Sequence, residues 1–77
     1  MSKDLRVAIE AIELQINKLK TSLNVYDNRL QSAFTKSLLG EECDVEISYC
    51  KSVKNQMNAA IKVLIELQQS LVIIDNN

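Results

Sequence analysis

The sequence predicts an all-α protein: an antiparallel two-helix hairpin with a long coiled-coil-like seam. Apolar residues recur with an alternating spacing of four and three from Leu5 to Ser37. Such spacing lines one side of a helix that packs lengthwise against another. The 77 residues contain no proline and one glycine, Gly40, which separates two stretches of similar length. This arrangement favours one domain, 1–77, made of two helices joined by a turn.

The first helix is expected over about residues 3–39. Ser2 is a suitable N-cap, and Asp4 places a negative charge where the helix dipole favours it. The segment 21–28 has low helix propensity, but the heptad spacing continues through it. We expect a continuous helix and keep a break near Asn24 to Asn28 as the alternative. The seam consists of Leu5, Ile9, Ile12, Ile16, Leu19, Leu23, Tyr26, Leu30, Ala33 and Ser37.

Gly40 can adopt the left-handed conformation that ends many helices, so the turn is placed there. A second helix should then run from about 41 to 74. Carboxylates are favoured at a helix N-terminus, and four follow the glycine directly: Glu41, Glu42, Asp44 and Glu46. The alternative is a docking patch for a basic partner. The spacing does not match a calcium-binding loop of the EF-hand type.

The inner face of the second helix has two interpretations, and each accounts for part of the apolar pattern. The first interpretation consists of Cys43, Ile47, Cys50, Met57, Ile61, Leu64 and Leu71. The second consists of Val53, Met57, Ala60, Leu64, Leu67, Leu71 and Ile74. Together they form a stripe broader than the seam of the first helix, as expected for a helix that meets more than one neighbour.

An antiparallel register follows from the turn at Gly40. Positions whose numbers sum to about 80 should lie opposite one another, which pairs Ala33 with Ile47, Tyr26 with Lys54, Leu19 with Ile61, and Ile12 with Gln68. Lys54 then lies on the seam, where its stem can follow Tyr26 while its amine reaches Asp27. Lys36 similarly faces the region of Asp44.

Cys43 and Cys50 are seven positions apart, roughly 10 Å along a helix. This exceeds the Cα separation of ~7 Å that a disulfide spans, so no intrachain bridge is expected. With no histidine and no further cysteine, a zinc site has too few ligands. We therefore expect two small buried hydrophobic residues, with an intermolecular disulfide across a dimer interface as the alternative.

The composition argues against catalysis. Histidine is absent, neither cysteine has an activating base nearby in sequence, and one glycine cannot build a phosphate-binding loop. We expect no catalytic, cofactor or metal site and no small-molecule substrate. The N-terminus lacks the pattern of a signal peptide, and we expect no apolar stretch of about 18 residues that would span a membrane. A cytoplasmic location without a membrane partner is expected.

A two-helix hairpin has one inner face, so apolar residues outside it need another partner. A chain of 77 residues is also near the limit for a stable single core. We therefore predict a protein interaction module that forms a homodimeric four-helix bundle or docks on a larger protein. The residues outside both seams, expected to come together at the open end, are Val7, Ala11, Leu14, Val63, Ile65, Val72 and Ile73.

A second hypothesis is association with nucleic acid. Lys18, Lys20, Lys51 and Lys62 would form a modest basic belt along the middle of the hairpin. The net charge of −1 provides no general attraction for phosphates, so such binding would depend on this belt.

The seam from Leu5 to Ser37 resembles the Rop family of plasmid copy-number regulators, which are dimeric helical hairpins that bind RNA. The basic and aromatic RNA-binding face of that family has no counterpart in this sequence. In size, in its lack of histidine and proline, and in its ending Asp75, Asn76, Asn77, the chain also resembles small helical accessory proteins of large tailed phages, such as the one encoded beside the UvsW recombination helicase. This resemblance implies an accessory role in DNA recombination, repair or replication and assigns no residue a role.

Overall fold

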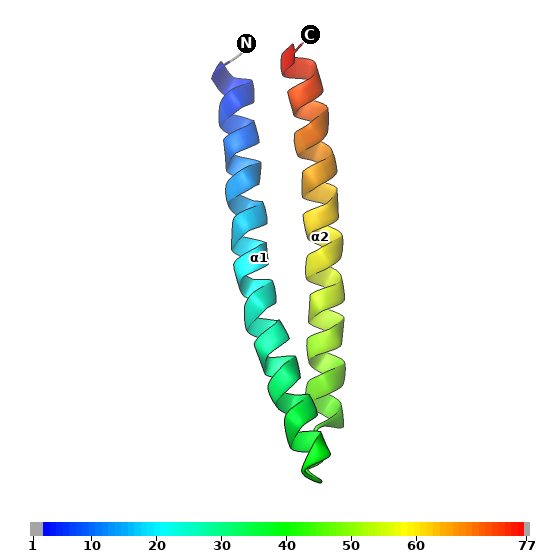
Figure 1. Ribbon diagram of the computed structural model, residues 1–77. Coiled ribbons are helices and arrows are strands. Elements are labelled where there is room, and N and C mark those ends of the chain that lie inside the picture. Colours follow the sequence, from blue (N-terminus) through cyan, green and yellow to red (C-terminus); the bar gives the residue numbers. More distant parts are fainter. Residues whose placement is uncertain (1–2, 77) are drawn as a thin grey trace.

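The computed structural model describes residues 3–76, which form two helices, α1 (Lys3–Leu38) and α2 (Asp44–Asn76). The helices lie side by side and run in opposite directions, so both ends of the chain are at the top of Figure 1 and the turn is at the bottom. The molecule measures 58 × 14 × 13 Å. The predicted all-α antiparallel hairpin is confirmed.

α1 is continuous, so the alternative of a break near Asn24 to Asn28 is wrong. One residue of low helix propensity in this segment, Thr21, bonds to the helix itself. The hydroxyl of Thr21 donates to the carbonyl of Asn17 at 3.0 Å. Such a bond lets a threonine remain within a helix without competing for the backbone donors.

The turn ends α1 with the hydrogen bonds of a Schellman motif. The N–H of Glu41 donates to the carbonyl of Lys36 at 3.1 Å, and that of Gly40 donates to Ser37 at 3.1 Å. Gly40 has φ of 92°, a left-handed conformation that side chains with a Cβ rarely adopt. The predicted role of the only glycine is confirmed.

The expected start of the second helix is wrong by three residues. The carbonyl of Cys43 accepts the first backbone hydrogen bond of α2, from Ile47 at 2.9 Å, so Glu41 and Glu42 precede the helix. The Schellman motif already uses the N–H of Glu41, and the chain needs the next residues to reverse direction. Only Asp44 and Glu46 lie in the first turn, and the helix ends at Asn76 rather than 74.

The seam of α1 lies against α2 as predicted, except at Ser37, which is exposed. Opposite it, α2 presents buried or half-buried residues with the same alternating spacing of four and three. We call this set the inner row: Cys43, Ile47, Cys50, Lys54, Met57, Ile61, Leu64, Gln68, Leu71 and Asp75. The first interpretation of the inner face is therefore confirmed. The three positions of the inner row that it lacks hold polar residues, Lys54, Gln68 and Asp75. From the second interpretation, Ala60, Leu67 and Ile74 are exposed.

Few side chains are fully covered. Among residues 3–76 the buried ones are Ile16, Leu30, Ala33, Cys50 and Ile61. A pair of helices buries one stripe of each helix and leaves the remaining surface to solvent or to a partner.

Candidate interaction surfaces

The hairpin has two broad sides, and contacts between the helices identify them. On one side, the Lys51 ammonium lies 5.6 Å from the ring centroid of Phe34. On the opposite side, Arg29 forms an ion pair with Glu46 at 2.7 Å. The seam and the inner row both repeat every seven residues. All remaining positions of each helix can therefore be assigned, from their place in the repeat, to one of the two broad sides or to the back of the helix. We call the first side the polar face and the second the apolar face.

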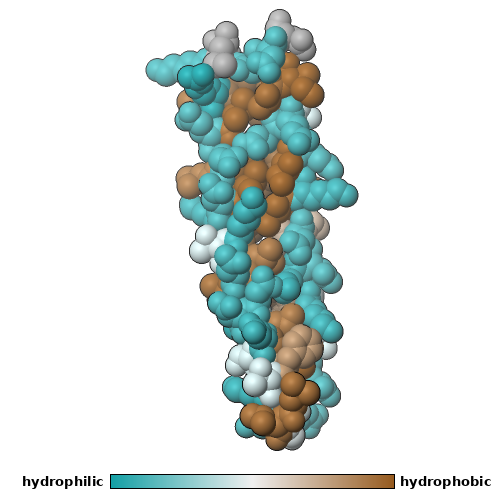
Figure 2. All heavy atoms as spheres, viewed as in Figure 1, coloured by the Kyte–Doolittle hydropathy of each residue, from teal (hydrophilic) through white to brown (hydrophobic). Residues whose placement is uncertain are grey.

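The polar face is visible in Figure 2, where hydrophilic side chains cover both helices and hydrophobic ones follow the groove between them. Gln68 bridges the helices here: its amide nitrogen donates to Glu13 at 2.6 Å and to the carbonyl of Ile9 at 3.5 Å. Lys54 reaches Asp27 in the ion pair that the register predicts. These contacts fix the register along one edge of the groove.

The apolar face combines small residues of α1 with larger residues of α2. Its members are Ala8, Ala11 and Val25 on α1, and Val53, Ala60, Val63, Leu67 and Ile74 on α2. Between positions 53 and 74, the charged residues of α2 are Lys54, Lys62 and Glu66. The heptad positions of these three lie on the inner row, the polar face and the back of the helix. Between these positions α2 therefore presents no charge on this face, whereas the heptad position of Lys18 places this lysine of α1 on it.

A polar cluster bounds the apolar face on the side of the turn. The guanidinium of Arg29 lies 5.0 Å from the ring centroid of Tyr26 and 5.6 Å from that of Tyr49, while its nitrogen atoms bond to Glu46. The hydrogen bond from Arg29, and after it that from the Cys50 thiol, holds the pKa of the Glu46 carboxyl below its ordinary value. The cluster thus keeps a carboxylate ionised beside an aromatic pair.

The two cysteines are free and lie at the turn end of the inner row. Cys50 is 0% exposed, and burial together with the hydrogen bond to Glu46 raises the pKa of its thiol. A buried, protonated thiol is a poor nucleophile. Burial therefore argues against an intermolecular disulfide at Cys50, while Cys43 is half-buried at the N-cap of α2.

The apolar residues expected at the open end share that end but not a single face. Val7, Leu14 and Ile73 are exposed on the backs of the helices. Ala11 and Val63 are on the apolar face, whereas Ile65 and Val72 are on the polar face, and Ile65 is half-buried there. The expectation that the seven residues come together is wrong, because their spacing distributes them around each helix.

The sequence predictions do not include the apolar face as an interaction surface. Its strongest signal is the repeat of Val53, Ala60, Leu67 and Ile74 at every seventh position, which the second interpretation of the inner face contains. A smaller apolar tip at the turn was also missed. It consists of Leu38, Leu39 and Val45, which are 88%, 79% and 84% exposed.

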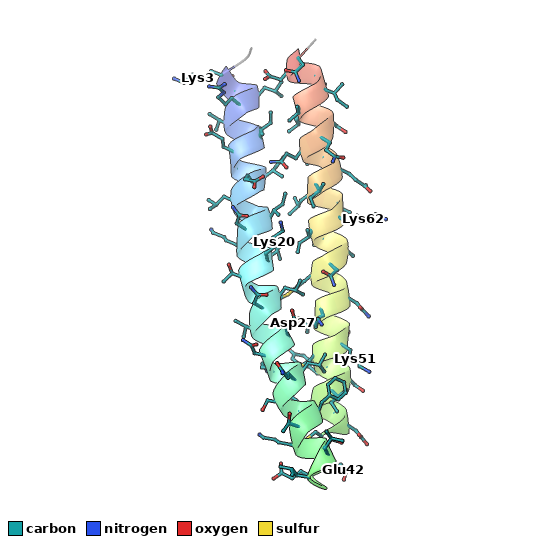
Figure 3. The ribbon with its side chains drawn as sticks, viewed as in Figure 1. Lys3, Lys20, Asp27, Glu42, Lys51 and Lys62 are labelled. Carbon is teal, nitrogen blue, oxygen red and sulfur yellow. The ribbon has the colours of Figure 1, made fainter. Side chains whose placement is uncertain are left out.

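The predicted basic belt is interrupted. Lys20, Lys51 and Lys62 are exposed toward the polar face (Figure 3), whereas the heptad position of Lys18 places it on the opposite face. Glu13 and Asp27 share the polar face with these lysines, so the local charge is mixed. Lys36 and Asp44, expected to face each other, both line an open depression at the turn with Arg29, Glu42 and Glu46.

No group of three Cys, His, Asp or Glu side chains within residues 3–76 is arranged to hold a metal ion. By length and composition alone, α2 is apolar enough to cross a membrane, and few residues of its apolar stretch are buried inside the hairpin. The expectation that no stretch of this length is sufficiently apolar is therefore wrong. No protein-family model, curated protein or solved structure matches the chain.

Proposed function

We propose that the protein is a non-catalytic interaction module of the cytoplasm, which self-associates or docks on a larger protein. The observation that carries this proposal is the imbalance between covered and uncovered apolar side chains. Five side chains are buried among the described residues, whereas large apolar residues are exposed along the whole length of both helices. Extended apolar surface of this kind marks sites of protein association.

The chemistry of the described surfaces supports a binding role. Two ion pairs between described residues connect the helices, Arg29 with Glu46 and Lys54 with Asp27. The one buried thiol is held protonated by its surroundings. Its hydrogen-bond partner Glu46 is a weak base, because the bond from Arg29 lowers the pKa of this carboxyl, so the pair lacks the activated thiolate from which nucleophilic catalysis starts.

Sedimentation equilibrium at about 100 μM, combined with identification of any co-purifying protein, tests the proposal. A stable dimer or a stoichiometric complex is the expected result. A folded monomer without any partner protein would count against an interaction module of either kind.

Association with nucleic acid is a second proposal, carried by the exposure of Lys20, Lys51 and Lys62 toward one face. It would fit an accessory role in DNA recombination, repair or replication. A gel-shift titration over increasing salt tests it, because phosphate contacts weaken steeply as salt rises. Absence of binding at about 50 mM salt would eliminate this function.

A further inference from the structure

We propose that the apolar face is the contact surface for a second copy of this chain, packed with the two turns at opposite ends of a four-helix bundle. This inference rests on the proposed function and deepens it by naming the partner, the face and the orientation. It uses the row Val53, Ala60, Leu67 and Ile74 together with Val63.

The hairpin exposes more surface than a compact monomer of its mass. The chain exposes 5675 Å², whereas a compact monomer of 8.7 kDa exposes about 4,700 Å². The excess of about 1,000 Å² is comparable to the ~800 Å² that each partner buries in a standard protein interface. A second copy laid along one broad face would therefore bring the surface of each chain to that of a compact protein.

The two broad faces differ in the charge that a second copy would cover. The polar face holds the interrupted lysine belt and its neighbouring carboxylates, so covering it would desolvate several charges. The apolar face presents no charge from α2 between positions 53 and 74. The cluster around Arg29 ends this surface near the turn, which places the contact toward the open end.

The alternation of small and large residues along the apolar row of α2 favours one orientation. With the turns at opposite ends and Val63 near the twofold axis, α2 packs on α2 of the second copy. Ala60 then lies opposite Leu67 of the second copy and Val53 opposite Ile74, so that a small residue meets a large one in the central pair.

Two matched substitutions test the face. Leu67 on the apolar face and Leu14 on the back of α1 are 47% and 54% exposed, so Leu67→Glu and Leu14→Glu place the same charge at equally accessible leucines. We expect Leu67→Glu to weaken the dimer by about 100-fold or more. Leu14→Glu should leave the dissociation constant unchanged, with helicity of both variants verified by circular dichroism.

A cysteine substitution tests the orientation and does not depend on the glutamate variants folding. Val63→Cys should give a covalent dimer under mild oxidation, because position 63 meets its own copy near the twofold axis. Ile74→Cys should not, since the two copies of position 74 lie far apart in this arrangement. Failure of Val63→Cys to cross-link, when the native chain is a dimer, would overturn the orientation.

Other outcomes separate this inference from the proposed function. A monomeric native chain overturns the second copy as the occupant. If that monomer co-purifies with another protein, the interaction module stands with a different partner. If it instead floats with phosphatidylcholine vesicles, the apolar face serves a membrane and both proposals fail. Equal dissociation by both glutamate variants would also overturn the assignment of the face.

Discussion

At the scale of single residues, the contacts around Arg29 connect the two helices near the turn. Its guanidinium bonds to Glu46 and lies over the rings of Tyr26 and Tyr49. The hydrogen bond lowers the pKa of Glu46 in the folded chain below the ordinary value of 4.5. A carboxylate with a lowered folded pKa stabilises the fold above its unfolded pKa, and that contribution is lost as the pH falls through the folded value.

The Glu46→Gln variant should therefore lose part of the acid sensitivity of the native chain. Between about pH 5 and pH 3, the melting temperature of the native protein should fall more than that of Glu46→Gln. Glu66→Gln is the matched control, since the Glu66 side chain lies on the back of α2. The melting temperature of this variant should change with pH in the same way as that of the native chain. Parallel curves for all three proteins would show that the ion pair contributes nothing to the pH dependence.

The inner row of α2 contains three polar residues, Lys54, Gln68 and Asp75. Lys54 and Gln68 have partners on α1, whereas one oxygen of Asp75 is buried without a hydrogen bond from any described group. Polar residues in a helical seam select one register at some cost in stability. The spacing of the seam of α1 could be recognised in the sequence because nearly all of its residues are apolar. The same spacing in α2 was harder to recognise because these three polar residues interrupt its apolar pattern.

Replacing the seam lysine should make the protein more stable. We expect Lys54→Leu to raise the free energy of unfolding by about 1 kcal/mol, because an apolar residue packs better between the helices than a half-buried ammonium. Lys62→Leu, at an exposed position of the same helix, should change it by less than about 0.5 kcal/mol. Urea denaturation measures both, and a destabilised Lys54→Leu would show that the ion pair with Asp27 outweighs the packing gain.

At the scale of the elements, one residue decides where α1 stops. Gly40 was identifiable because it is the only glycine and follows the last apolar positions of the first helix. The start of α2 was not identifiable in the same way, because four carboxylates in six residues are compatible with a helix beginning at any of them. Only the hydrogen bonds of the turn place Glu41 and Glu42 outside the helix.

Gly40→Ala isolates the backbone contribution of the turn, because an added Cβ would have no atom within 4 Å. The substitution should lower the free energy of unfolding by about 1 kcal/mol, the cost of holding alanine at φ of 92°. Gly40→Asn should lose less, since asparagine tolerates this conformation better. Thermal or urea unfolding of the two variants measures the difference, and equal stability of Gly40→Ala and the native chain would contradict it.

At the scale of the whole molecule, the hairpin is long for its mass. Its radius of gyration is 17.5 Å, against roughly 11.5 Å for a compact domain of this length. The sequence predicted the pairing of the helices and the presence of apolar surplus, since both follow from periodicity. It did not reveal which face carries the surplus, because residues such as Val7 and Val63 look alike until the register of both helices is known.

Stability should consequently depend on protein concentration. If a second copy covers the apolar face, a tenfold dilution should lower the melting temperature by about 3 to 5 °C, since folding and association are then one equilibrium. Leu67→Glu should melt at a temperature that does not change with dilution. A native melting temperature that is constant from about 1 to 100 μM would indicate a monomer.

Both ends of the described chain lie at the open end of the hairpin, away from the turn (Figure 1). A pair of fluorophores attached near Lys3 and Asn76 would therefore report directly on separation of the helices at that end. Energy transfer between them would fall when the open end frays and would remain high while Gln68 stays bonded to Glu13. The same geometry means that a protein fused to either end of the described chain is held at the open end and leaves the turn accessible.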